Sequence, residues 1–310
     1  MQPRIVFMGT PEFSVPTLEK LNTEFGVDCV VTVPDKPRGR GRKMIPSAVK
    51  ARALELGLRI LQPESLKDED FVNEIKKTEP DIIAVVAFRI LPPEVYQQAR
   101  LGAFNIHASL LPKYRGAAPI NWAIINGEKS TGLTSFLLER KVDTGRILMQ
   151  HAFDIPENAT AGDLHDMMMP MAADMAADTV RMLASGDYAA MPQDDSTATP
   201  APKIFREHCE IKWGGHAMNV GHLINGVSPV PGAWTMLDGN IVKILRCEPC
   251  SCGRGEAGSF AIEGDRMIVY CGKGMIEVKE IQPSGKRPMA ARDFIRGWRG
   301  PMQGRFETAE

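Results

Sequence analysis

The chain has 310 residues and a formal net charge of −1, with 44% hydrophobic and 24% charged residues. This composition is typical of a globular protein long enough for two domains, and it excludes disordered and fibrous classes. No apolar run reaches the roughly 18 residues of a membrane helix, and the N-terminus lacks the pattern of a secretory signal. We therefore expect a cytoplasmic protein without a membrane partner, and nothing in the composition demands more than a monomer.

The first half of the chain alternates expected strands and helices. The expected strands are 4–8, 27–33, 59–61, 81–86 and 102–107, and the helices between them are 14–25, 47–56, 68–77 and 93–100. The run 81–86 is apolar on both faces, as in the middle of a parallel sheet. This order predicts an α/β fold with a doubly wound, Rossmann-like sheet, which binds ligands at the carboxyl ends of its strands. The first turn, residues 9–13, lacks the Gly-x-Gly-x-x-Gly fingerprint, which argues against a nicotinamide enzyme.

A basic stretch follows the second expected strand. Residues 34–52 contain seven basic side chains against one acid, Asp35, and a second basic stretch covers residues 279–305. Two local patches on a nearly neutral protein indicate a polyanionic partner bound at defined places. For the first patch, a flexible solvated loop is the alternative at this point.

Strand 102–107 ends in the stretch of greatest chemical interest. Asn105 and His107 are two residues apart, and in an extended strand this spacing points both side chains to the same face. An amide can donate to a developing oxyanion, and an imidazole can hold or give a proton near neutral pH. A hydrogen-bonded structural pair is the alternative, and these two residues alone leave it open.

Beyond this strand we expect a helix at 120–125 and strands at 132–139 and 146–149. Asp143 begins the turn between the two strands, where a carboxylate often only caps its own backbone. With Asn105 and His107 in view, Asp143 could instead hold the imidazole and the ammonium of an amine nucleophile. The Met- and Ala-rich segment 160–185 predicts a long helix, which Pro170 should kink or split.

The composition changes again after residue 185. Residues 186–210 are expected to link an N-terminal domain, 1–185, to a C-terminal domain, 211–310. After a helix at 215–226, short β-like runs are expected at 233–237, 241–247, 259–262, 267–270 and 274–281. Such closely spaced short strands predict a small β-barrel of the OB type, a module that often binds nucleic acid.

The cysteines raise the question of a metal site. Cys247, Cys250, Cys252 and Cys271 could in principle hold zinc, but the spacing lacks the usual second pair of ligands. We expect reduced thiols in a loop and no metal.

Taken in order, these motifs resemble the methionyl-tRNA formyltransferase family along nearly the whole chain. The resemblance rests on residues 5–13, 34–43, 105–112, 115–120, 143–145, 282–287 and 291–294. In the family, the basic loop enters the acceptor arm of the initiator tRNA. Residues 87–92 are one residue shorter than the family's folate-binding loop.

The resemblance implies an enzyme that moves a formyl group from 10-formyltetrahydrofolate to the α-amine of methionyl initiator tRNA, for translation initiation. The implied catalytic residues are Asn105, His107 and Asp143, and no metal is required. The implied folate contacts are Phe88, Ile90, Leu91, Ser109, Leu110, Leu111 and Pro112. The implied tRNA contacts are Arg38, Arg40, Arg42, Lys43, Lys203, Lys286 and Arg287.

Two other functions stay open. The first is another folate-dependent N-formyltransferase, acting on a sugar nucleotide or on glycinamide ribonucleotide. The second is a non-catalytic RNA-binding protein with an OB module.

Overall fold

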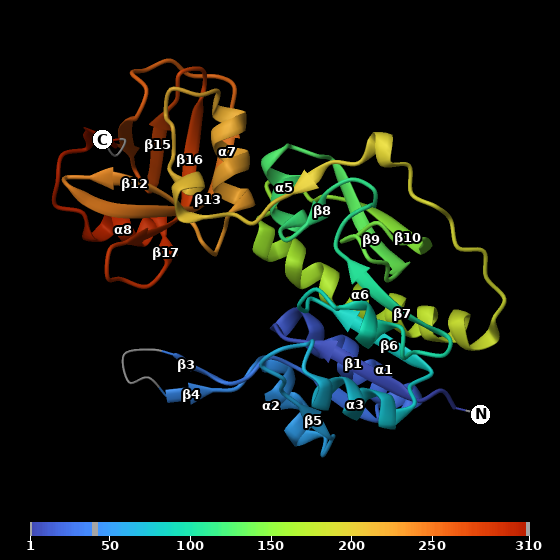
Figure 1. Ribbon diagram of the computed structural model, residues 1–310. Helices are drawn as coiled ribbons and strands as arrows, with labels where there is room; N and C mark the ends of the chain where they lie inside the picture. The colour runs from blue at the N-terminus through green and yellow to red at the C-terminus, as the bar shows by residue number, and fades with distance from the viewer. Residues whose placement is uncertain (1, 39–42, 308–310) are drawn as a thin grey trace. The chain divides into compact units, whose positions relative to one another are not determined.

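The computed structural model describes residues 2–38 and 43–307, and the chain forms two compact units (Figure 1). The first unit comprises Met1–Gly116, Gly132–Phe153 and His165–Pro200, and the second comprises Ala117–Thr131, Asp154–Leu164 and Ala201–Glu310. Within the described ranges, no helix has the length and apolar character needed to cross a membrane.

The first unit is built on a sheet of strand order β10-β9-β7-β6-β1-β2-β5. Its strands are β1 Ile5–Gly9, β2 Cys29–Val31, β5 Ile60–Leu61, β6 Ile82–Val86, β7 Gly102–His107, β9 Ser130–Leu137 and β10 Ile147–Asp154. The five strands from β5 to β7 run parallel, whereas β9 pairs antiparallel with β7. From β1 the chain moves outward to β2 and β5 and then returns to the other side of β1, so the sheet is doubly wound.

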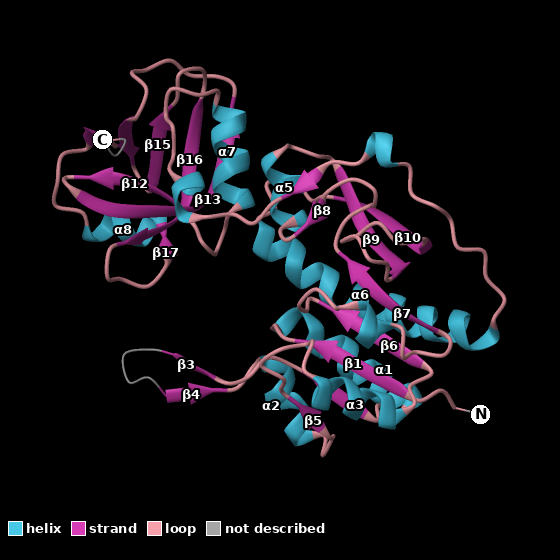
Figure 2. Cartoon of the chain, viewed as in Figure 1, coloured by secondary structure: helices cyan, strands magenta, loops and turns pink. Residues whose placement is uncertain are grey.

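Helices cover the sheet of the first unit (Figure 2). They are α1 Val15–Phe25, α2 Ala48–Glu55, α3 Glu69–Thr78, α4 Pro93–Tyr96 and α6 Ala161–Ser185, with a 3₁₀ turn at Glu12–Ser14. The side chain of Asp68 caps α3 by accepting the N–H groups of Asp70 and Phe71. Phe71 and Ile75 then pack in one core with Val6 and Ile83 of the sheet. Because every residue of β1 and β6 is buried, both faces of the sheet centre are covered, as predicted.

Helix α6 is continuous through Pro170, so this proline does not split the helix in two. Thr179 of this helix donates a hydrogen bond of 2.7 Å to the Ser135 hydroxyl of β9, in a buried position. This bond fixes the helix against the sheet.

The basic stretch after β2 contains two short strands in its described residues. β3 Lys36–Arg38 and β4 Lys43–Ile45 pair as an antiparallel hairpin. At its base, Lys50 Nζ lies 2.6 Å from Asp35 Oδ2, and Gln62 Nε2 donates to Asp35 Oδ1 at 2.9 Å. The bond from Lys50, followed by that from Gln62, lowers the pKa of Asp35. The acid of this stretch is thus already paired within the protein.

The second unit contains an antiparallel sheet of order β12-β13-β16-β15-β14-β18, with β17 beside β16. Its strands are β12 Ala233–Leu237, β13 Asn240–Cys250, β14 Ser259–Glu263, β15 Arg266–Tyr270, β16 Met275–Pro283, β17 Met289–Ala290 and β18 Gln303–Arg305. Register shifts around Arg246 mark a bulge, which bends β13. Inside, Trp213 stacks on Phe306 with ring centroids 5.6 Å apart. This half-barrel agrees with the predicted OB-like module, and the predicted fold class is confirmed.

The helices of the second unit are α5 Pro119–Ile125, α7 Ala217–Gly226 and α8 Ala291–Gly297. Asn225 of α7 exchanges two hydrogen bonds of 3.1 Å with the backbone of Cys247. Asn121 of α5 donates to the carbonyl oxygen of Gly226 at 2.7 Å. Both helices therefore belong to the same packed body as the C-terminal sheet.

Candidate active site

Asn105 and His107 lie at the carboxyl end of β7, an inner strand of the first sheet. Asn105 is paired in register with Val85 of β6, and His107 with Thr134 of β9. Because β7 is bonded on both sides, its backbone is fixed and alternate side chains keep to one face. Ligands of doubly wound sheets bind at this end.

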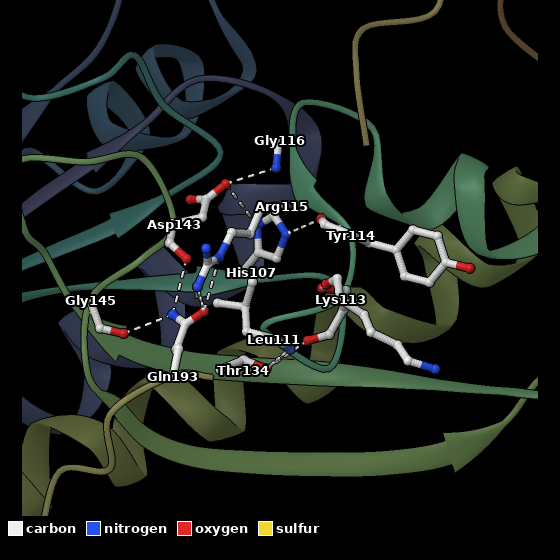
Figure 3. A network of polar contacts seen from close by, with 11 residues as sticks. His107, Leu111, Lys113, Tyr114, Arg115, Gly116, Thr134, Asp143, Gly145 and Gln193 are labelled. Atoms are coloured by element: carbon white, nitrogen blue, oxygen red, sulfur yellow. Dashed lines mark hydrogen bonds and ion pairs between the residues drawn. The ribbon is translucent and has the colours of Figure 1, made fainter. Parts of the chain in front are cut away.

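His107 is only 6% exposed, and each of its ring nitrogens faces an oxygen atom of the protein (Figure 3). Its Nε2 lies 2.8 Å from the carbonyl oxygen of Tyr114. Since a carbonyl only accepts, Nε2 carries the hydrogen of this bond. Nδ1 lies 3.9 Å from Asp143 Oδ2, which is an ion-pair distance but too long for a hydrogen bond. Nδ1 is thus the nitrogen that remains for exchanging a proton.

Asp143 is directed away from its own turn. Its Oδ2 accepts a hydrogen bond of 2.9 Å from the N–H of Gly116, which is 27 residues away in sequence. The residue has a φ of 54°, in the left-handed region. Gly145 completes the turn, because an added Cβ there would lie 1.6 Å from the carbonyl oxygen of Leu137. Tight packing of the turn thus aims the carboxylate at His107.

The side chain of Asn105 has an unusual feature. Its Oδ1 is buried and has no hydrogen-bond partner in the part of the chain that the structure describes. A buried polar atom without a partner costs about 1–3 kcal/mol, so such atoms are rare and need an explanation. Rotating the amide by half a turn would present its NH₂ group at the same place. The amide is therefore available to a ligand.

Hydrogen bonds from β9 and β10 hold the loop that follows β7. Thr134 Oγ1 donates to the backbone oxygen of Ser109 at 2.6 Å and accepts the Leu111 N–H at 3.1 Å. Gln150 Nε2 donates to the oxygen of Leu111 at 2.8 Å. Gly132 leaves room for Leu110, because an added Cβ would lie 2.4 Å from the Leu110 side chain. The predicted folate contacts Ser109, Leu110, Leu111 and Pro112 thus belong to one fixed loop.

The remaining predicted folate contacts follow β6. Ile90 is 72% exposed, whereas Leu91 is buried and Phe88 packs against the core of the first unit. Arg89 ties this loop down by donating to the carbonyl oxygens of Glu64, at 2.9 Å, and Pro63, at 2.8 Å. Burial lowers the pKa of the Arg89 guanidinium. Ile90 is therefore the predicted residue of this loop that most exposes apolar surface.

The predicted tRNA contacts are on the surface where the structure describes them. Lys203, Lys286 and Arg287 are exposed, and no ion pair joins them to any described carboxylate. Lys203 Nζ lies 5.4 Å from the centre of the Phe205 ring, which is 48% exposed. Arg40 and Arg42 lie outside the described residues. Arg38 and Lys43 belong to the hairpin strands, and only their backbone is described.

The cysteines do not assemble into a metal centre in the described ranges. No group of three or more His, Cys, Asp or Glu side chains there is placed to hold an ion. Burial raises the pKa of Cys271 to about 11 and moves that of Cys247 well above its usual range. Burial therefore disfavours the thiolate form that binds zinc.

Gln193 was not among the site residues predicted from the sequence. Its Nε2 donates to the backbone oxygens of Asp143, at 3.0 Å, and Gly145, at 2.8 Å, and its Oε1 accepts from Arg115 Nη2 at 2.7 Å (Figure 3). Gln193 lies in the segment predicted as a linker, whose composition carries no signal of a role in the site. Arg115, the partner of Gln193, lies in the motif at residues 115–120, and this motif was the sequence signal that could have directed attention to its contacts.

Comparison with known proteins assigns the chain to a family. The formyl transferase family model matches residues 3–178, and the model of the formyl transferase C-terminal domain matches residues 203–299. A methionyl-tRNA formyltransferase of Caldanaerobacter subterraneus subsp. tengcongensis is 44% identical over 298 residues, covering 95% of this chain and 96% of its own. One from Chlorobium phaeovibrioides is 42% identical over 306 residues, covering 96% and 95%.

Solved structures share the fold. The sugar 3N-formyl transferase WlaRD superposes with a TM-score of 0.68 at 19% identity, covering 93% of this chain and 100% of that one. An N-formyltransferase from Helicobacter canadensis, solved with folinic acid and dTDP-3-aminofucose, gives 0.66 at 17% identity, covering 89% and 98%. At such identities the likeness concerns the fold alone. The two family matches and the full-length relatives show that the chain belongs to the methionyl-tRNA formyltransferase family.

Proposed function

We propose that this chain transfers a formyl group from 10-formyltetrahydrofolate to the α-amine of methionyl initiator tRNA. The observation that carries the proposal is the group at the end of β7: an imidazole facing a carboxylate at 3.9 Å, and the buried Asn105 amide oxygen, which has no hydrogen-bond partner in the described chain. These groups suit an acyl transfer in which the amine itself is the nucleophile. Family membership supplies the class of reaction.

The reaction needs stabilisation of one oxyanion and transfer of one proton. The amine lone pair attacks the formyl carbon, a C–N bond forms, and the carbonyl electron pair moves to oxygen. When the oxyanion collapses, the bond to N10 breaks, N10 gains a proton and the amine loses one. Asn105 donates its amide N–H to the oxyanion, a contact worth roughly 3 kcal/mol when it is preorganised.

The proposed role of His107 is proton transfer through Nδ1. Its Nε2–H is already engaged by the carbonyl of Tyr114. Protonated Nδ1 donates to the oxyanion and then gives its proton to N10. Asp143 stabilises the imidazolium across 3.9 Å and accepts, directly or through water, the proton that the amine loses.

The proposed folate site lies between the loops after β6 and β7. These strands are neighbours and run parallel, so their carboxyl ends meet at one edge of the sheet. Phe88, Ile90 and Leu91 would contribute from one loop, and Ser109, Leu110, Leu111 and Pro112 from the other. The exposed side chain of Ile90 suits van der Waals contact with the face of a ligand ring.

The proposed tRNA contacts are exposed cations. Lys203, Lys286 and Arg287 have no ion pair with a described carboxylate, whereas Arg181 and Arg246 are each paired with acids. Unpaired surface cations are available to phosphates. The basic side chains predicted from the sequence between residues 38 and 43, Arg38, Arg40, Arg42 and Lys43, complete the proposed set. Since every proposed group comes from one chain, we expect a monomer to be active.

The test offers two acceptors to the wild-type chain. Labelled 10-formyltetrahydrofolate is incubated with charged initiator tRNA in one arm and with a dTDP-linked amino sugar in the other. We expect formylmethionine only in the tRNA arm. Formylation of the sugar amine instead would assign a sugar N-formyltransferase. Tight tRNA binding without transfer to either acceptor would identify a non-catalytic RNA-binding protein.

A further inference from the structure

We propose that Gln193, in the segment 191–199, is a positioning residue for catalysis, so that this segment does more than connect two domains. The proposal rests on the proposed function, because that function gives Asp143 its role. Gln193 has no part in the transfer chemistry itself. It acts by fixing the turn that carries the Asp143 carboxylate.

The hydrogen bonds of Gln193 join two loops that hold the catalytic side chains. Its amide nitrogen bridges the backbone oxygens of Asp143 and Gly145 at 3.0 and 2.8 Å. Its amide oxygen accepts from Arg115 Nε and Nη2 at 3.1 and 2.7 Å. Arg115 directly precedes Gly116, whose N–H binds the Asp143 carboxylate. One side chain therefore fixes both ends of the Asp143 hydrogen bond.

Neighbouring residues of the same segment make further hydrogen bonds to the two loops that Gln193 joins. Met191 exchanges two backbone hydrogen bonds with Ile147, of 2.8 and 2.9 Å, just after the Asp143 turn. Thr199 accepts the Arg115 N–H with its backbone oxygen and the Tyr114 N–H with its hydroxyl, each at 2.9 Å. Tyr114 supplies the carbonyl that holds the His107 ring. Both groups that orient the imidazole are thus attached to one segment.

Glutamine suits this place because it donates and accepts at once. Two carbonyl oxygens need N–H donors, and the guanidinium needs an acceptor. Asp195 takes a further hydrogen of the guanidinium at 2.7 Å. Together, Gln193 and Asp195 engage Arg115, and among the described residues the Asp143 carboxylate has an ion pair with His107 alone.

The experiment compares Gln193→Glu and Gln193→Ala with wild type. Glutamate keeps the pair with Arg115 but places an oxygen against the two carbonyls, so only the bonds to the Asp143 turn are removed. Alanine removes both sets of bonds. In each variant we expect kcat to fall by about tenfold to a hundredfold, with KM for tRNA and folate nearly unchanged. Asp194→Ala is the control, because the Asp194 carboxylate caps the 3₁₀ turn of the same segment and binds Ser196.

A positioning role also predicts non-additivity. When Asp143 is already Asn, Gln193→Ala should lower kcat by less than about twofold further, since both changes act through one group. Wild-type kcat in both Gln193 variants, or full additivity with Asp143→Asn, would overturn the proposal. An inactive wild-type chain would instead overturn the proposed function. In that case hydrogen exchange tests whether Gln193 fixes the Asp143 turn. Faster exchange at the Gly116 amide in Gln193→Ala would support this role of Gln193, and unchanged exchange would overturn it.

Discussion

At the carboxyl end of β7 the side chains of His107 and Asp143 are largely covered and held in place, whereas the cations Lys203, Lys286 and Arg287 are exposed and have no ion pair to any described carboxylate. His107 is fixed by Tyr114, and Asp143 by Gly116. The first arrangement maintains geometry to a fraction of an ångström, and the second offers charge without a fixed geometry. Changes in the first region should therefore alter turnover, and changes in the second should alter affinity and its salt dependence.

The largest effect is expected at the end of β7, where we propose that catalysis takes place. His107→Ala should lower kcat by about a thousandfold, because the proton donor is removed, while the dissociation constant for tRNA stays within about twofold. His165→Ala is the matched control, since His165 is more exposed and pairs with Asp166. Steady-state kinetics and filter binding measure the two quantities. Normal turnover of His107→Ala would remove this residue from the mechanism.

The next effect concerns the loop after β7. Thr134→Val removes the hydroxyl that joins Ser109 and Leu111, so we expect a loss of about 1–3 kcal/mol in the free energy of unfolding and a higher KM for the folate. Thr78→Val removes a hydroxyl bond of 2.6 Å at the end of α3. This control should lose stability without a change in KM. Equal folate KM in both variants would show that the loop does not meet the folate.

A smaller effect is expected at the surface. The double change Lys286→Ala and Arg287→Ala should weaken tRNA binding and make it less dependent on salt. The slope of log K against log salt should fall by about 1 for each phosphate that is no longer neutralised. Arg266→Ala is the control, because Arg266 is exposed but pairs with Glu277. Binding titrations at several salt concentrations measure the slope, and an unchanged slope in the double variant would leave these cations without a phosphate partner.

The smallest effect lies at the amino end of β6, opposite the site. The backbone N–H of Arg4, followed by Arg100, lowers the pKa of Asp81 against the opposing effect of burial. A folded pKa below the unfolded one stabilises the protein above about pH 4, and this contribution is lost as the pH falls through the folded pKa. Asp81→Asn should lose about 1 kcal/mol at pH 7 and progressively less in acid, with kcat unchanged. Urea unfolding at several pH values measures the difference in unfolding free energy between wild type and Asp81→Asn. A difference that stays the same at every pH would contradict the prediction.

The sequence was sufficient for the parts of the fold that repeat a local pattern. The apolar run at Ile82–Val86 placed β6 in the sheet centre, and the strand period put Asn105 and His107 on one face at the ligand-binding end. The chemistry proposed for these two residues and for Asp143 came from the family resemblance. None of this required knowledge of distant contacts.

The rest depends on contacts between residues far apart in the chain. Residues 36–38 and 43–45 show no strand-like alternation, so the β3–β4 hairpin carries little local signal. Gln193 reaches Asp143 across 50 residues from a segment of linker composition. Asn121 packs α5 with the C-terminal sheet through Gly226, at a separation of 105 residues. Such pairings follow from tertiary packing, which local propensity does not encode.

The most direct measurement is the single-turnover rate of formyl transfer at saturating tRNA, compared between His107→Ala and the double change Lys286→Ala and Arg287→Ala. If chemistry resides at β7 and the cations only bind, His107→Ala stays about a thousandfold slow at saturation. The double variant then reaches the wild-type rate once enough tRNA is added. Equal rate losses in both variants at saturation would contradict this division between a fixed catalytic site and a charged binding surface.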